Sequence, residues 1–260
     1  MLKSQICQEK DFATIWFFRA CQMLKNPPAF HRKLWEYAFI YEALLERGML
    51  QLGKHGIGFG VGQEPLVSMF AAHGSQILAT DLDLDEAIRR GWVDTNQHSH
   101  DLTSLNRWNI CDDTVFRHLV SFQSVDMNAI PNTLNNKFDF SWSSSSLEHL
   151  GSLKNSKQFL LKQMETLRPG GVAVHTTEYN LFSNDATYDN IATVVFRKRD
   201  IEDLVEEFHA KGYEIEVDFT IGEGPIESIV DMPPFEGPIQ LRIQLGEFVT
   251  TSIGLIIQKK

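Results

Sequence analysis

The sequence has few cysteines and no long apolar run, and each absence excludes a class of protein. Its three cysteines, Cys7, Cys21 and Cys111, are scattered and form no CxxC pair. This spacing excludes a zinc knuckle and a disulfide framework and suits a reducing compartment, so we expect a cytoplasmic protein. No stretch approaches the roughly 20 apolar residues that span a bilayer, so we expect no membrane partner.

Positive charge is also scarce. Lysine and arginine number 24 against 34 aspartates and glutamates, which gives a net charge of −10 at pH 7. A chain of this sign is repelled by phosphate backbones and anionic lipid, so we expect no nucleic-acid partner. The 260 residues, 43% of them hydrophobic, predict a globular protein of one or two domains and leave open whether it forms a homo-oligomer.

The first 50 residues predict a helical extension. Apolar residues recur there at three- and four-residue spacing, at Leu34, Tyr37, Ala38, Tyr41, Leu44 and Leu45. Aromatic residues are frequent in the same helix. We expect this segment to pack on the flank of a sheet; the alternative is a cover over a bound substrate.

Residues 51–260 predict a doubly wound α/β domain. Short apolar runs alternate with amphipathic stretches, which is typical of a mostly parallel sheet with helices on both faces. The predicted strands are His55–Gly60, Gln76–Thr80, Leu119–Val125, Phe138–Trp142, Gly171–His175 and Tyr213–Phe219. Leu241–Leu245 and Phe248–Ile257 flank a tight turn and predict an antiparallel strand at the end. Residues 84–118 form an insert that we expect to fold over the site.

Four alternating glycines, Gly56, Gly58, Gly60 and Gly62, lead into a predicted helix with Pro65 near its start. Glycine lets the backbone approach a ligand closely and adopt positive φ. The GxGxxG fingerprint of dinucleotide-binding proteins fails in all three registers of this segment.

The GxGxG pattern of Gly58, Gly60 and Gly62 instead resembles class I S-adenosylmethionine-dependent methyltransferases. The resemblance implies a seven-stranded sheet and S-adenosylmethionine as cofactor, with S-adenosylhomocysteine as product. It also implies that the three glycines bind the cofactor. Asp81 and Leu82 directly follow the next predicted strand, where the family has an acidic residue that accepts both ribose hydroxyls.

Further motifs of the family follow along the chain. Val125-Asp126-Met127 resembles the motif whose acidic residue accepts from the adenine amino group while its neighbour packs on the ring. Ser143 and Ser144 follow a predicted strand at the place where the family's chain passes over the sulfonium, and Leu167–Gly171 resembles the LxPGG loop. Asp83 is an alternative to Asp81, and the Cys111–Asp113 segment is an alternative to Asp126.

The chain departs from the family at Gly56, where an acidic residue is common. The departure leaves open how the cofactor's methionine ammonium group is held. Glu64 and backbone carbonyl groups are the two alternatives.

Three residues are the predicted catalytic groups. His149 is the first candidate for a general base, because its unperturbed pKa is about 6.5. Glu148 stands beside it, and the pair resembles the Glu-His ending of methyltransferases that act on quinone-precursor phenols. Glu178 follows the fifth predicted strand, and we expect residues 175–180 to face the same crevice.

The sequence predicts no metal site. In the resembling enzymes an earlier glutamate helps to bind a metal, and this chain has Ser145 there. A divalent ion held by Glu178, Tyr179 and His149 remains the alternative. His98 and His100 have HxH spacing, but we expect them at a lid or at the cofactor's edge.

The resemblance implies methylation of an oxygen on a small hydroxylated or glycosyl acceptor, as in enzymes of bacterial polysaccharide and natural-product pathways. The alternatives are N-methylation of a small amine and a protein that binds the cofactor without catalysis.

Overall fold

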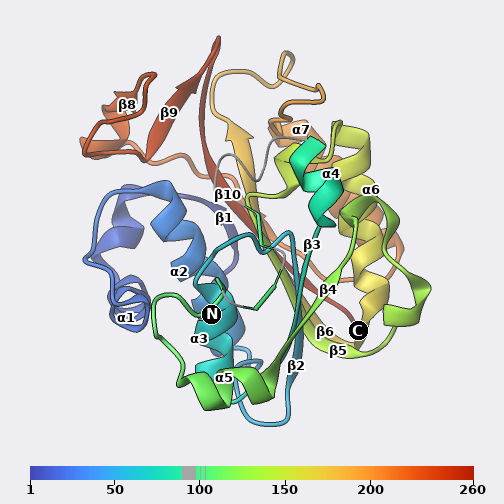
Figure 1. The fold of residues 1–260 in the computed structure, drawn as a ribbon. Helices are drawn as coiled ribbons and strands as arrows, with labels where there is room; N and C mark the ends of the chain where they lie inside the picture. The colour runs from blue at the N-terminus through green and yellow to red at the C-terminus, as the bar shows by residue number, and fades with distance from the viewer. Residues whose placement is uncertain (90–97, 100, 103) are drawn as a thin grey trace.

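The computed structural model describes residues 1–89, 98–99, 101–102 and 104–260. Within them one mixed sheet carries helices on both faces (Figure 1). The strands are β1 (Ser4–Ile6), β2 (His55–Phe59), β3 (Gln76–Asp81), β4 (Val120–Ser124), β5 (Phe138–Ser144), β6 (Leu167–Asn180), β7 (Val217–Asp218), β8 (Val230–Asp231), β9 (Arg242–Leu245) and β10 (Phe248–Gln258). The α-helices are α1 (Ile15–Leu24), α2 (Arg32–Leu45), α3 (Leu66–Ala72), α4 (Leu84–Arg89), α5 (Asp113–Leu119), α6 (Leu153–Gln163) and α7 (Lys198–Ala210).

The strand order is β4-β3-β2-β5-β6-β10-β1-β7, with β9 paired to β10 and β8 to β9. The strands from β4 to β6 are mutually parallel, whereas β10 runs antiparallel to β6 and to β9. The predicted fold class, with its antiparallel C-terminal strand, is therefore confirmed.

The predicted number of strands is wrong: the described residues form a sheet of ten strands rather than seven. The additional strands include β1 and β8, which have three and two residues. Segments this short do not show the period-two alternation by which a strand is recognised. β8 lies in the glycine- and proline-rich stretch between Gly222 and Gly237.

Each face of the sheet has its own apolar core. Val172 and Val174 of β6 belong to the cluster that contains residues of α1, α2, α3 and α5. Ala173, between them, belongs to the cluster formed with α6 and α7. Side chains alternate between the two faces of a strand, so β6 joins both cores. Figure 1 shows the two sets of helices on opposite sides of the sheet.

The N-terminal segment joins the sheet as well as covering it. Its helices α1 and α2 agree with the predicted helical extension, but β1 inserts between β10 and β7. α2 packs against β5, β6 and β10. Arg32, the first residue of α2, pairs with Glu178 near the carboxyl end of β6, so the start of α2 lies at this end of the sheet.

The insert at residues 84–118 contains α4 and α5 in its described part. No helix in the described ranges is long and apolar enough to cross a bilayer.

Candidate active site

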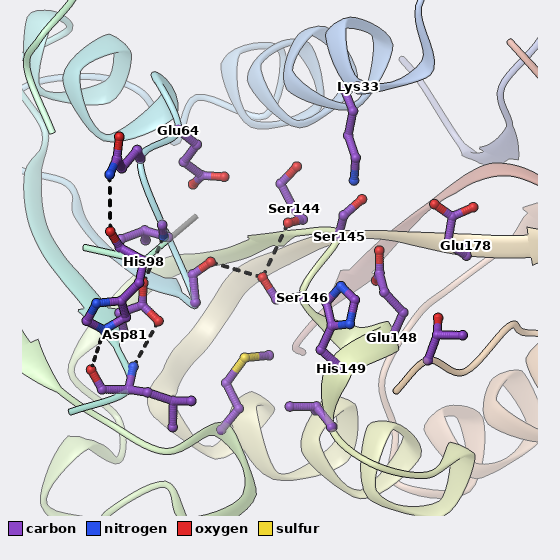
Figure 2. Close-up of a pocket in the computed structure, with 18 of the residues that line it drawn as sticks. Lys33, Glu64, Asp81, His98, Ser144, Ser145, Ser146, Glu148, His149 and Glu178 are labelled. Atoms are coloured by element: carbon purple, nitrogen blue, oxygen red, sulfur yellow. Dashed lines mark hydrogen bonds between the residues drawn. The ribbon is translucent and has the colours of Figure 1, made fainter. Parts of the chain in front are cut away.

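A cavity of about 640 Å³ opens where β2, β3, β5 and β6 reach their carboxyl ends (Figure 2). Ligands of open parallel sheets bind at this edge. We call one part the β3 end, lined by Gly60, Gly62, Asp81, Leu82, Asp126 and Met127. We call the other part the β6 end, lined by Arg32, Lys33, Glu148, His149 and Glu178. The cavity thus brings together most of the residues predicted from the sequence.

The glycine turn after β2 forms one wall of the β3 end. Gly60 and Gly62 have positive φ of 58° and 50°, a conformation in which glycine carries no steric cost. A Cβ atom on Gly60 would lie 2.8 Å from Oγ of Ser146 and 3.2 Å from Sδ of Met127. Both glycines line the cavity, so bare backbone faces a ligand there.

Gly56 and Gly58 have a different role. Within β2 they pair with Phe140 and Trp142 of β5. A Cβ atom on Gly56 would lie 2.3 Å from the Phe140 ring, and one on Gly58 2.4 Å from the Trp142 ring. Neither glycine is among the cavity-lining residues. The rings of β5 therefore explain why β2 has no side chain, acidic or otherwise, at Gly56.

Asp81 ends β3 and is held by backbone N–H groups. Its Oδ2 accepts hydrogen bonds from Gly62 N at 3.0 Å and Ser99 N at 3.3 Å, and its Oδ1 accepts from Leu82 N at 2.8 Å. Burial raises the pKa of Asp81 above its usual value, although these hydrogen bonds oppose the shift. The alternative residue, Asp83, is exposed and accepts from Glu86 N at the start of α4.

Asp126 and Met127 follow β4 and line the same end. The Asp126 side chain accepts from Asn128 N at 2.8 Å, which fixes the turn. The alternative, Asp112, instead caps α5 by accepting from Thr114 N and Val115 N. His98 also lines the cavity, with Nε2 2.8 Å from Leu82 O, whereas His100 lies outside the described residues.

The serine segment at the end of β5 connects the two ends. Ser146 Oγ donates to Gly60 O at 2.9 Å, which ties this segment to the glycine turn. Ser145 has a φ of +47°, an uncommon strained conformation for a residue other than glycine. Ser144 lines the cavity, but Ser143 does not: its hydroxyl lies 2.8 Å from Nδ1 of the buried His175.

A buried carboxylate on α2, Glu36, organises the β6 end. Its two oxygens accept hydrogen bonds from the hydroxyl groups of Ser144, Ser145, Thr176 and Ser252. Arg32 and Lys33 each lie 3.5 Å from it. Burial opposes its ionisation, but the two cations and the hydroxyl groups together hold the pKa of Glu36 below its usual value.

The other carboxylates of the β6 end differ in their partners. Glu178 pairs with Arg32 at 2.5 Å and accepts from Thr250 Oγ1 at 3.0 Å. Glu148 accepts from Thr177 Oγ1 at 3.2 Å and forms no ion pair with a lysine or arginine of the described chain. Figure 2 shows Glu148 and His149 side by side at this end.

His149 lies in a 3₁₀ turn after β5, with Nδ1 3.3 Å from Ala192 O. A carbonyl oxygen can only accept, so this contact assigns the proton of the neutral ring to Nδ1. Nε2 is then the ring atom that can take a proton.

The expectation that residues 175–180 share one crevice is wrong, because side chains alternate along β6. Of these six residues only Glu178 lines the cavity. His175 packs edge-on against Phe159 of α6 on the opposite face, and burial lowers its pKa to about 3. Tyr179 belongs to the same opposite core. In the described part of the chain there is no group of three histidine, cysteine or acidic residues arranged to hold a metal.

Arg32 and Lys33 are among the cavity residues that the sequence did not place in the site. A signal existed, because Glu36 interrupts an otherwise apolar helix face and stands four residues after Arg32. Glu64, one of the alternatives for the ammonium group, is buried and lines the cavity between the two ends.

The residues present fit an adenosyl sulfonium. The wall of bare backbone at Gly60 and Gly62 gives room for a ligand, and Asp81 can accept from a vicinal diol beside it. A cavity with several carboxylates also suits a ligand of positive charge.

No family model and no curated protein matches the chain. Solved structures do. A structure described as that of an S-adenosylmethionine-dependent methyltransferase from Listeria monocytogenes matches with a TM-score of 0.52 and 12% identity, over 88% of this chain and 98% of the other. An S-adenosylmethionine-dependent methyltransferase from Mesorhizobium loti matches with a TM-score of 0.50 and 14% identity, over 84% and 97%. At these identities the likeness shows that the chain has the methyltransferase Rossmann-like fold.

Proposed function

We propose that this protein is an S-adenosylmethionine-dependent methyltransferase that methylates an oxygen of a small hydroxylated or glycosyl acceptor. One observation carries the proposal: a single cavity joins the positive-φ glycine turn and Asp81 to His149 and Glu148. The fold shared with solved methyltransferases supports it.

The β3 end would hold the cofactor. Asp81 accepts from the ribose hydroxyls, Asp126 accepts from the adenine amino group, and Met127 packs on the ring. The backbone of Gly60 and Gly62 lies under the methionine end, next to Leu82 and Ser144. Gly58 and Ser143 would support the wall of the cavity without touching the cofactor. Each contacts a side chain of a neighbouring strand, and neither lines the cavity.

When bound, the cofactor supplies a methyl carbon activated by a positively charged sulfur. The residues of the β6 end then place the acceptor in line with that carbon, and such positioning is worth several kcal/mol of the barrier. His149 takes the acceptor's hydroxyl proton on Nε2, since Nδ1 faces Ala192 O. Glu178, fixed by Arg32, is an acceptor for a second substrate hydroxyl.

N-methylation is the second candidate function. The observation that favours it is Glu148, a cavity carboxylate that accepts a hydrogen bond from Thr177 Oγ1 and pairs with no lysine or arginine of the described chain. A protonated amine would complement this carboxylate. An amine acceptor needs no base as strong as a hydroxyl acceptor does, so the two candidates differ in their dependence on His149.

The experiment that tests the proposal begins with isothermal titration of the protein with S-adenosylmethionine and S-adenosylhomocysteine. Turnover of methyl-labelled cofactor is then measured against a panel of sugars, phenols and amines. Transfer to a sugar or phenol supports the proposal, and transfer to amines alone supports the second candidate. Binding without transfer to any acceptor identifies a cofactor-binding protein, and absence of binding ends both candidates.

Replacing His149 separates the two chemistries. For a hydroxyl acceptor, we expect His149→Ala to lower kcat by about 10²–10⁴, the usual effect of losing a general base. Affinity for the cofactor, measured by titration, should stay within about twofold, because His149 lies at the β6 end. An unchanged kcat on a hydroxyl acceptor would show that His149 is not the base.

A further inference from the structure

Glu64 is a buried carboxyl group that faces the cavity. It follows the glycine turn and is 6% exposed. Trp142 Nε1 donates to Glu64 Oε1 at 2.6 Å, and in the described chain no lysine or arginine pairs with this residue. Figure 2 shows its carboxyl group directed into the space between Asp81 and Ser144.

The charged and titratable groups around Glu64 come from β3, from α2 and from the segment before α5. They are Asp81 from β3, Glu36, Lys33 and Tyr37 from α2, and Arg107 from the segment before α5. Lys33 pairs with Glu36, and Arg107 donates to Gln63 Oε1 at 2.6 Å, so each cation has another partner. Burial raises the pKa of Glu64 to about 8, and the charges of Asp81 and Glu36 add to the shift.

The packing of β2 explains why a carboxyl group that could pair with a cation stands after the glycine turn, at Glu64, and not within β2. An acidic side chain at Gly56 is excluded, since even a Cβ atom would lie 2.3 Å from the Phe140 ring. The ring system that closes this position continues to Trp142, which holds Glu64 on the cavity side. Phe140 therefore excludes an acidic side chain from β2, and Trp142 positions the carboxyl group of Glu64 after that strand.

We propose that Glu64 forms the subsite for the ammonium group of the cofactor's methionine end, and that it gives up its proton when that cation arrives. The inference rests on the proposed function, because it assigns one part of the same cofactor. In the free protein at pH 7, burial keeps the Glu64 side chain mostly as the carboxylic acid, since it has no lysine or arginine partner among the described residues. On binding, its O–H bond breaks, the proton passes to solvent, and the carboxylate pairs with the ammonium group, which keeps its three protons.

Isothermal titration of the wild-type protein with S-adenosylmethionine, in phosphate and in Tris at the same pH, measures the protons released. A group of pKa about 8 is mostly protonated at pH 7, so we expect Glu64 to release about 0.9 proton at pH 7. Near pH 8 the cofactor's own amino group takes up a proton on binding, which offsets this release. The Kd should fall about tenfold from pH 6 to pH 7, since one proton must leave for each cofactor bound.

A comparison of two ligands with an uncharged sulfur isolates the amino-acid end. S-adenosylhomocysteine keeps that end, so we expect it to release a proton as S-adenosylmethionine does. 5′-Methylthioadenosine has the nucleoside but no amino-acid end, so we expect it to bind the wild-type protein without proton release and with a Kd that is independent of pH. Release with both ligands, or with neither, would overturn the inference, and this comparison needs no variant.

Glu64→Gln tests the residue itself. Glutamine keeps the size of the side chain and an acceptor for Trp142 Nε1. We expect the variant to bind S-adenosylmethionine about 10–100-fold more weakly at pH 8, the usual worth of a charge-assisted hydrogen bond, with no proton release. Its affinity for 5′-methylthioadenosine should be unchanged, which also reports that the cavity is intact.

Asp126→Asn is the matched control, since Asp126 is another carboxyl group that lines the cavity. It should weaken both ligands yet keep the proton release. Glu64→Gln that still releases a proton would contradict the assignment while the proposed function stands. Failure of the wild-type protein to bind either ligand would instead overturn the proposed function.

Discussion

The buried carboxyl groups along the cavity differ in the partners that the protein gives them. At the β6 end, Glu36 and Glu178 share Arg32 and are surrounded by hydroxyl donors. At the β3 end, Asp81 is held by backbone N–H groups, and Glu64, which lies between the two ends, is held by an indole. No lysine or arginine in the described ranges pairs with either of these two carboxyl groups.

The difference indicates what each end can bind. Burying a carboxylate without a cation costs free energy, which a cationic ligand at the β3 end would recover. At the β6 end, Glu36 and Glu178 are already neutralised within the protein, so a neutral substrate there is recognised by hydrogen bonds and shape. Glu148 is the exception at that end, since it has no lysine or arginine partner among the described residues. A cavity divided in this way suits a cationic cofactor beside an acceptor that is largely uncharged.

The largest expected effect comes from closing the β3 end. Gly60→Val places a β-branched side chain at a φ of +58° and at contact distance from Ser146, so we expect no measurable binding of S-adenosylmethionine. Titration measures it, and circular dichroism checks that the variant is folded. Gly212→Val is the control, because Gly212 also has positive φ but has open space around it. Normal binding by Gly60→Val would show that the turn has only an architectural role.

The second prediction removes the cation that Glu36 and Glu178 share at the β6 end. Arg32→Met leaves Glu178 and Glu36 without their shared cation, and removing one partner of a buried pair costs about 3–5 kcal/mol. Urea unfolding measures the loss. Lys198→Met is the control, since its pair with Glu202 has both side chains 49% exposed and is worth about 0–1 kcal/mol. Equal losses of unfolding free energy in the two variants would show that the buried pairs of Arg32 stabilise the protein no more than an exposed pair does.

The sequence predicts features that depend on local pattern. Alternating apolar runs and amphipathic helices place the strands from β2 to β6 within a few residues, because periodicity reflects which side chains are buried. The glycine turn, Asp81 and Asp126 follow from their place after a strand. All three line the cavity, and their assignment to the cofactor remains a prediction.

Features that depend on tertiary contacts could not be predicted. The sequence gives no reason to divide the four glycines into two that face aromatic rings and two that line a cavity, since the division depends on the pairing of β2 with β5. Arg32 and Lys33 reach the site only because α2 packs across β5, β6 and β10. The sequence shows the order of the residues along β6. Which of their side chains face the cavity depends on the register in which β6 pairs with its neighbouring strands.

The smallest expected effect concerns the hydrogen bonds of one residue at the β3 end. Asp81→Ala removes the carboxylate that would accept from the ribose hydroxyls, and we expect weaker binding of S-adenosylmethionine by about 1.5–3 kcal/mol. Titration measures the change. Asp83→Ala is the matched control: Asp83 stands two residues later, is exposed, and accepts from Glu86 N at the start of α4, so its loss should leave the affinity unchanged. If the two variants lose affinity equally, the β3 end attracts the cofactor by net negative charge, and the position of the Asp81 carboxylate beside the glycine turn has no specific role.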